Sequence, residues 1–212
     1  MLNLSILDLL VPILGIILSI LYVPVTLLTL LVHRRFSEIT TWRSFRQAWF
    51  GRFWYCFGWA SRALFAPDVE KVLAGAHGVV LDIGTGSGDW GVDELERWGV
   101  KPGTVDTIST VHVLCSVQSP ALLVGDLYRY LKLGGRWLVY EHVKVRRKWS
   151  LTAGFQAMIN IVWPYFFDGC SMTRETEDLL LHSGKWTSAD LRPAPNEGWF
   201  NALPHTVGVL VK

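Results

Sequence analysis

The sequence predicts an α/β fold in which a mainly parallel sheet follows an N-terminal membrane-anchor helix. Three observations predict it. Residues Leu9–Val32 form an uncharged apolar run, the apolar stretch Val79–Ile83 leads directly into a glycine-rich turn, and strand and helix patterns alternate from there onward. Such alternation is typical of a parallel sheet covered by helices. With 212 residues, the chain has room for one globular domain besides the anchor.

The apolar run at residues 9–32 is long enough to cross a bilayer. As a helix it spans about 36 Å, whereas the hydrocarbon layer is ~30 Å thick. The run exceeds the apolar core of a cleaved signal peptide and has no basic leader. We therefore expect residues 1–35 to be an uncleaved transmembrane anchor. A buried core helix is one alternative, and Pro12, Gly15 and Pro24 leave open a bent, monotopic insertion.

Residues 36–67 are expected to form an aromatic-rich interfacial helix or linker. The stretch 42–65 interleaves Trp, Tyr and Phe with arginines, which suits the boundary between membrane and water. An ordinary helix that packs its rings on the domain is the alternative, because the arginines do not share one helical face. Since cations stay on the cytoplasmic side of a membrane, the following domain is expected in the cytosol. The arginines that follow the apolar run most closely are Arg34, Arg35, Arg43, Arg46 and Arg52.

Charge and cysteine usage narrow the class of protein. The net charge of +2 gives no indication of nucleic-acid binding. Cys56, Cys115 and Cys170 are widely spaced, and neither C-x-x-C nor H-E-x-x-H occurs, so the sequence predicts no disulfide framework and no metal site. Cys115 and Cys170 are expected to be small buried hydrophobic residues.

A domain is expected over residues 68–212. Its predicted strands lie at 79–83, 105–111 and 136–143, with a closing antiparallel pair near 186–191 and 205–211. Its predicted helices lie at 119–133, ended by Gly134 and Gly135; at 149–163, ended by Pro164; and at 174–182, capped by Thr173. Asp168 is expected either to cap a helix or to point into the site.

The glycine turn carries the clearest indication of function. Asp82 is followed by Gly84, Gly86 and Gly88 in a G-x-G-x-G spacing, which brings a ligand against bare backbone. This pattern resembles motif I of class I S-adenosylmethionine-dependent methyltransferases. The segment 131–136, LKLGGR, before a strand resembles a frequent feature of the same fold. A nicotinamide-dependent reductase is disfavoured by the glycine spacing and by the lack of a Tyr-x-x-x-Lys pair.

The C-terminal part resembles one subfamily more closely. Tyr140-Glu141-His142, Trp163-Pro164, Asp168-Gly169-Cys170 and Arg174-Glu175-Thr176 are similar to the methyltransferase-like 7 family. That resemblance implies an enzyme on the endoplasmic reticulum or on lipid droplets. It also implies S-adenosyl-L-methionine as cofactor, a small lipophilic acceptor such as a thiol, and membrane lipid as a partner.

The resemblance implies a set of cofactor-binding residues but no dedicated nucleophile. Methyl transfer from a sulfonium requires mainly alignment and exclusion of water. His112 or His142 is a candidate base for an acceptor thiol, and a structural role is the alternative for each. The cofactor-binding set is Asp82, Gly84, Thr85, Gly86, Ser87, Gly88, Thr110, Val111 and His112. A tight turn without a ligand is the alternative for the glycines.

The chain between the glycines and the next strand is too short for a complete fold of this class. Residues 89–104 hold at most one short helix, whereas two strands and their crossovers need on the order of 45–60 residues. The sequence therefore predicts an incomplete Rossmann-like methyltransferase sheet with two strands missing. The acid that binds the ribose at the end of the second strand is missing with them. Asp93 and Glu94 are weak substitutes, for which a solvated helix face is the alternative.

The short connection also constrains topology and function. A helix on the usual face would make the first crossover left-handed, so either the helix moves to the opposite face or the glycine turn is distorted.

The leading functional hypothesis is a membrane-anchored methyltransferase whose activity is weakened by the shortening. The alternative is a non-catalytic membrane or lipid-droplet protein that retains part of the fold.

Overall fold

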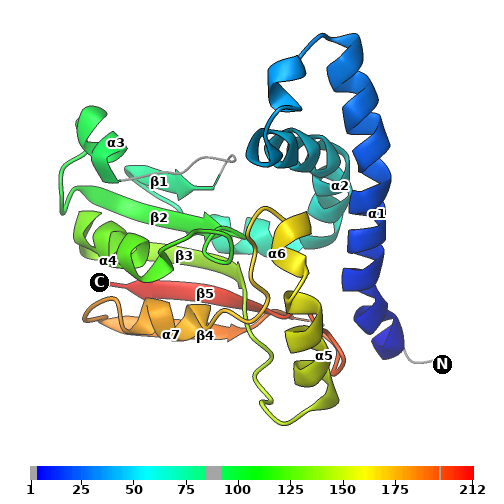
Figure 1. Ribbon diagram of the computed structural model, residues 1–212. Helices are drawn as coiled ribbons and strands as arrows, with labels where there is room; N and C mark the ends of the chain where they lie inside the picture. The colour runs from blue at the N-terminus through cyan, green and yellow to red at the C-terminus, as the bar shows by residue number, and fades with distance from the viewer. Residues whose placement is uncertain (1–3, 85–91, 196) are drawn as a thin grey trace.

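The computed structural model describes residues 4–84, 92–195 and 197–212. Within them lies a five-stranded sheet with the strand order β1-β2-β3-β5-β4 (Figure 1). Strands β1, β2 and β3 are parallel, and β5 and β4 complete the sheet in antiparallel pairing. The strands are β1 (Val80–Ile83), β2 (Val105–Val111), β3 (Leu131–His142), β4 (Ser188–Pro193) and β5 (His205–Val211). The predicted α/β class and the closing antiparallel pair are confirmed.

Helices cover both faces of the sheet. One face carries α3 (Val92–Arg97), α4 (Pro120–Tyr130) and α7 (Thr176–Leu181), whose apolar side chains pack on a core that includes Ile108 and Trp137. Because α3 contacts α4, both connecting helices lie on the same face, and both parallel crossovers are right-handed (Figure 1). Helix α3 therefore lies on the opposite face, which is one of the two arrangements expected for the short connection; the other, a distorted glycine turn, involves residues 85–88, which lie outside the described residues.

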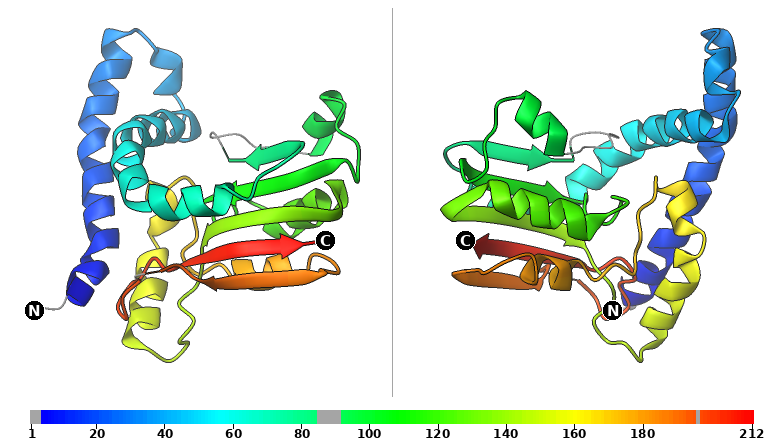
Figure 2. Two further views of the ribbon diagram at one scale, coloured as in Figure 1. Left: turned by 180° about the vertical axis from the view of Figure 1, so that it is seen from behind. Right: turned by 60° about the vertical axis from the view of Figure 1, so that its left-hand side comes forward.

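The other face of the sheet is covered by the C-terminal half of α2 (Trp42–Leu73), as Figure 2 shows from behind. Phe65, Val69 and Val72 of this helix pack against Tyr140 and Val207 of the sheet. Helix α2 is continuous across residue 68, where the domain was expected to begin. Its aromatic rings point both ways, with Phe53 fully buried and others, such as Trp59, exposed.

Helix α1 (Leu4–Val32) runs beside α2 and lies against the domain along one side. The indole nitrogen of Trp49 donates a 2.7 Å hydrogen bond to the carbonyl oxygen of Ser19, and Gly15 packs against the ring of Phe167. The opposite side of α1 exposes large apolar residues from Leu10 to Val32. Residues 8–32 reach a mean hydropathy of 2.4, so the helix is long and apolar enough to cross a membrane.

Several predicted helix ends are wrong. The helix expected to reach Leu133 ends at Tyr130, because Leu131 already pairs with Val105 and begins β3. Gly134 and Gly135 therefore lie inside β3 and do not cap a helix. Gly134 has φ +74°, and its N–H donates to the carbonyl oxygen of Lys212, so this part of β3 is tied to the C-terminus.

The expected helix over 149–163 is divided into two shorter helices. α5 (Leu151–Asn160) is capped by the Ser150 hydroxyl, and α6 (Trp163–Phe166) carries Pro164 in its first turn. Proline fits that position because its missing N–H has no helical partner there, so Pro164 begins a helix where we expected it to end one. Thr173 does not cap the following helix either, because α7 begins only at Thr176. The Thr173 hydroxyl instead accepts a hydrogen bond from the side-chain amide of Asn160.

Candidate active site at the carboxyl edge of the sheet

The carboxyl ends of β1, β2 and β3 meet at one edge of the sheet, which faces α6 and α1 (Figure 1). His205 at the start of β5 pairs with His142 at the end of β3, so the antiparallel strand brings its first residue to the same edge. Ligands of open α/β sheets bind in the crevice outside such an edge. This edge is therefore the place where chemistry is expected.

The end of β1 joins the end of β2 through side chains. Asp82 is exposed and accepts a hydrogen bond from the hydroxyl of Ser109, which is buried in β2. Gly84 has φ +103°, and a Cβ at this position would overlap the Cγ2 atom of Val113. Only glycine fits both restraints. The other predicted residues of the turn, Thr85, Gly86, Ser87 and Gly88, lie outside the described residues.

The end of β2 places three predicted residues in different environments. Thr110 is fully buried, and its hydroxyl accepts a 3.1 Å hydrogen bond from the indole nitrogen of Trp137. Val111 is half-buried. His112 follows with φ +55°, a conformation that few residues other than glycine adopt, and its N–H still donates to the carbonyl oxygen of Tyr140.

A buried carboxylate fixes the loop that follows His112. The two oxygens of Glu141 accept hydrogen bonds of 3.0–3.1 Å from the N–H groups of Val113 and Leu114. Glu141 has no exposed surface, and burial raises the pKa of its carboxyl group to about 8. Because strand β3 supplies this clamp, β3 positions the backbone after β2.

Three histidines gather at the same edge; we call His112, His142 and His205 the histidine cluster. The rings of His112 and His142 stack at 4.5 Å with an interplanar angle of 16°, and His205 lies 4.5 Å and 4.9 Å from them. Burial lowers the pKa of His112 and His205, and the neighbouring histidines lower it further. Both rings are therefore neutral near pH 7. Phe65 of α2 packs against His112 and His205.

Two thiols lie beside this cluster. Cys115 and Cys170 are buried, as predicted, and the Sγ atom of Cys170 is 3.8 Å from Nδ1 of His142. The hydrogen bond from Cys170 and the burial of the site raise the pKa of Cys115 well above its usual value. Arg174 donates hydrogen bonds to the carbonyl oxygens of Leu114 and Val117, which holds the loop between β2 and α4 in place.

Comparison with curated proteins identifies relatives over about half of the chain. Thiol S-methyltransferase TMT1B of Rattus norvegicus is 33% identical over 110 residues, which are 51% of this chain and 44% of the relative. TMT1B of Homo sapiens is 32% identical over 130 residues, which are 56% and 52% of the two chains. About half of the chain is thus similar in sequence to thiol S-methyltransferases. The resemblance to the methyltransferase-like 7 family is thereby confirmed.

A further relative agrees with this relationship. TMT1A of Homo sapiens is 31% identical over 116 residues, which are 53% of this chain and 46% of the relative. No protein-family model matches the chain. The chain spans about half the length of the curated relatives it matches.

Some of the candidate residues lie together and others do not. Asp82, Gly84 and His112 share the carboxyl edge, and the two candidate bases, His112 and His142, are in contact. Asp168 has φ +46° and forms a 3.6 Å ion pair with Arg46 of α2, so it neither caps a helix nor belongs to the histidine cluster. Asp93 belongs to α3, as does Glu94.

Sequence reasoning missed two residues of this edge. Glu141 contacts a loop 27 residues earlier, and His205 reaches the cluster only through the pairing of β5 with β3. The sequence motif Tyr140-Glu141-His142 indicated that the segment matters, but it did not indicate which partner Glu141 holds. For His205, strand pairing is the only signal, and a single sequence does not carry it.

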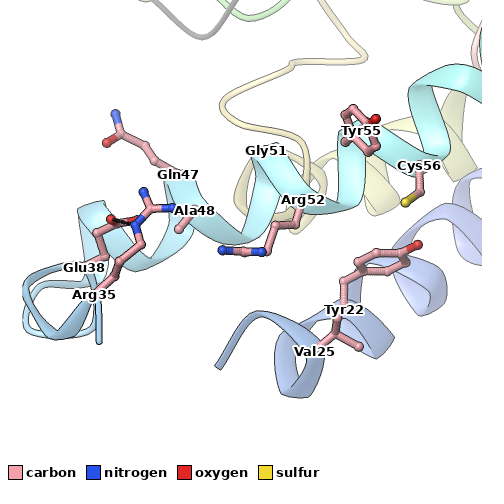
Figure 3. Close-up of a pocket in the computed structure, with 10 residues that line it drawn as sticks. All are labelled: Tyr22, Val25, Arg35, Glu38, Gln47, Ala48, Gly51, Arg52, Tyr55 and Cys56. Carbon is pink, nitrogen blue, oxygen red and sulfur yellow. Dashed lines mark hydrogen bonds and ion pairs between the residues drawn. The ribbon is translucent and has the colours of Figure 1, made fainter. Parts of the chain in front are cut away.

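Two surface hollows lie away from the carboxyl edge. One of about 510 Å³ lies between α1, α2 and the short helix η1 (Phe36–Glu38), with Tyr22, Arg52 and Tyr55 in its wall (Figure 3). The other, of about 620 Å³, lies beside α7 and includes Lys144 and Glu175. Neither of these two hollows is lined by the histidine cluster or by the described end of β1.

Proposed function

We propose that this chain is an S-adenosyl-L-methionine-dependent methyltransferase of a small lipophilic acceptor. The single observation that carries the proposal is the end of β1, where Asp82 accepts a hydrogen bond from Ser109 and is followed by Gly84, a position that no larger residue fits. This turn stands at the edge where α/β sheets bind ligands, in a chain of which about half is similar in sequence to thiol S-methyltransferases. The acceptor of those relatives, a thiol, is the substrate class that we propose here.

The cofactor is proposed to lie against the backbone of residues 84–88, with Asp82 orienting the turn. Val111 and His112 would border it at the end of β2, and Thr110 would support them from the core through its bond to Trp137. The short connection after the turn leaves no acid at the end of a second strand to bind the ribose. We therefore propose weaker cofactor binding and slower turnover than in a full-length enzyme.

The position of the edge beside the apolar helices supports the proposal of a lipophilic acceptor. The carboxyl ends of β1, β2 and β3 point toward α6 and α1, and α1 exposes an apolar side to its surroundings (Figure 1). An acceptor that partitions into lipid would reach the site without crossing bulk water. This arrangement favours an apolar thiol over a charged one.

We propose that α1 anchors the chain by lying in one leaflet, with the domain in the cytosol on endoplasmic reticulum or lipid droplets. Contacts from Gly15 to Phe167 and from Ser19 to Trp49 hold the middle of α1 against the domain. A helix that crossed the bilayer would lose these contacts, because the domain is too polar to follow it. The monotopic insertion left open by the sequence is therefore preferred over a spanning anchor.

Methyl transfer from radiolabelled S-adenosyl-L-methionine tests the function. The full chain in phospholipid nanodiscs is expected to methylate a long-chain alkane thiol faster than cysteine. Asp82→Asn is expected to lower the rate at least ~10-fold because the turn loses the negative charge of the carboxylate. Asp190→Asn, on the exposed edge strand β4, is the matched control and keeps the rate. No labelled product from a folded chain would favour the non-catalytic alternative.

Protease protection tests the anchor. An epitope tag is placed at each end of the chain, and sealed microsomes are treated with protease from the cytosolic side. A helix in one leaflet leaves both tags exposed to the protease. Protection of the N-terminal tag alone would show that α1 spans the membrane.

A further inference from the structure

The histidine cluster brings three metal-binding side chains together from three neighbouring strands. His112 follows β2, His142 ends β3 and His205 begins β5, and one ligand nitrogen of each lies within 4.8 Å of the others. The nitrogens of a tetrahedral zinc site lie about 3.4 Å apart, given Zn–N bonds of about 2.0–2.1 Å. Side-chain rotations that move the ligand nitrogens by roughly 1 Å would therefore bring all three within bonding distance of one ion.

Two nitrogens of the cluster are buried and have no partner among the described residues. These are the Nε2 atoms of His112 and His205. His205 is only 2% exposed, so bulk water does not reach its ring. Burying such an atom without a partner costs about 1–3 kcal/mol, and native proteins rarely leave it so. An ion that accepts both lone pairs would remove this cost.

A carboxylate orients one of these rings for coordination. Oε1 of Glu197 lies 2.6 Å from Nδ1 of His205, and Glu197 also accepts a hydrogen bond from the His205 N–H. The Nδ1 proton is thereby held on the carboxylate side, which leaves the lone pair on Nε2. Metal-binding histidines in proteins typically have such a carboxylate partner.

We propose that His112, His142 and His205 bind a divalent transition-metal ion, zinc being the best fit, and that the open fourth position receives the sulfur of the acceptor thiol. Three neutral imidazoles with an open position are the donor set of catalytic zinc sites. The site contains no carboxylate ligand, which disfavours magnesium and calcium. The metal site stands on geometry alone, whereas its role toward a thiol rests on the proposed function.

The ion would supply the activation that we first assigned to a histidine base. As the thiol binds, its S–H bond breaks and the proton leaves to solvent, since a coordinated thiol is deprotonated. A sulfur lone pair then forms a bond to the methyl carbon of the sulfonium donor. The bond between that carbon and the donor sulfur breaks, and its electron pair stays on the donor. The products are a thioether and the demethylated, neutral donor.

A second group of ligands shares His142 and competes with this assignment. The Sγ atoms of Cys115 and Cys170 also lie within 4.8 Å of a His142 nitrogen. Their thiols are not free, however, because they contact each other and Cys115 also lies 3.5 Å from the hydroxyl of Ser116. The unpartnered atoms belong to the histidines, so we assign the ion to the histidine cluster.

Zinc and cobalt titrations of the full chain in nanodiscs test the site. After chelator treatment, the chain is expected to bind one zinc ion, and cobalt is expected to give visible d–d bands without a sulfur-to-cobalt charge-transfer band. His205→Ala and His112→Ala should abolish this binding. His182→Ala changes an exposed histidine at the end of α7 and is the matched control that keeps it.

A milder variant covers the case in which the histidine variants fail to fold. Glu197→Gln keeps all three rings and is expected to weaken zinc binding about 10–100-fold. Circular dichroism confirms that each variant is folded. The proposal is overturned if the folded wild-type chain binds no zinc. It is also overturned if Cys170→Ser, rather than the histidine variants, removes binding together with a sulfur-to-cobalt band. These outcomes do not depend on methyl transfer, so failure of the proposed function is a separate result.

Discussion

Substitution of Gly84 by alanine tests how the glycine turn is held against the loop after β2. The change adds a Cβ at φ +103°, which costs about 1–3 kcal/mol in backbone strain. The same Cβ overlaps Cγ2 of Val113, a buried and stiff side chain, and such overpacking costs about 1–3 kcal/mol more. The free energy of unfolding is therefore expected to fall by about 2–6 kcal/mol.

Gly99→Ala separates the two contributions to this loss. Gly99 has φ +75°, but a Cβ there would meet no atom within 4 Å, so only the backbone strain remains. Urea unfolding in nanodiscs, followed by circular dichroism, gives both free energies. We expect Gly84→Ala to cost about 1–3 kcal/mol more than Gly99→Ala. Equal losses would refute the contact between the turn and Val113, and with it the position of the cofactor site.

Two further changes test the support of the site. Thr110→Val removes the acceptor of the buried indole N–H of Trp137 and should lower the free energy of unfolding by about 1–3 kcal/mol; a loss below about 0.5 kcal/mol in urea unfolding would contradict the hydrogen bond. Asp106→Asn tests the start of β1, where the Asp106 carboxylate binds Lys132 and the Val79 N–H, which lower its pKa below the usual 3.8. The pKa of Asp106 is lower in the folded chain than in the unfolded chain, so the ionised carboxylate stabilises the fold. The free energy of unfolding should therefore exceed that of Asp106→Asn by a constant amount above about pH 5, and this difference should shrink as pH falls below about 3.8. Unfolding free energies of both chains from pH 6 to pH 2 measure it, and an advantage that persists unchanged to pH 2 would contradict the account.

Local pattern predicted the strands better than the helix ends. The bounds of β2 were predicted correctly as Val105–Val111, a segment rich in the β-branched residues that favour strands. The predicted end of α4 was wrong because Leu131 pairs with Val105, which lies 26 residues earlier in another strand. Tertiary contacts therefore decided where the helix stops.

The candidate site was predictable only in part for the same reason. Asp82 and Gly84 were found because the acid, the glycines and the preceding strand are adjacent in sequence. Glu141, His205 and Glu197 act across long separations, and no spacing rule connects them. The histidine cluster has no closely spaced sequence motif, because strand pairing assembles it from residues far apart in the chain.

The proposed function depends most directly on whether this chain binds its cofactor. Isothermal titration of S-adenosyl-L-methionine into the full chain in nanodiscs measures this binding without requiring turnover. The account predicts saturable binding in the micromolar range that Gly84→Ala weakens strongly and Gly99→Ala does not. Absence of binding heat from a chain whose circular dichroism shows it to be folded would contradict the account and leave a non-catalytic membrane protein.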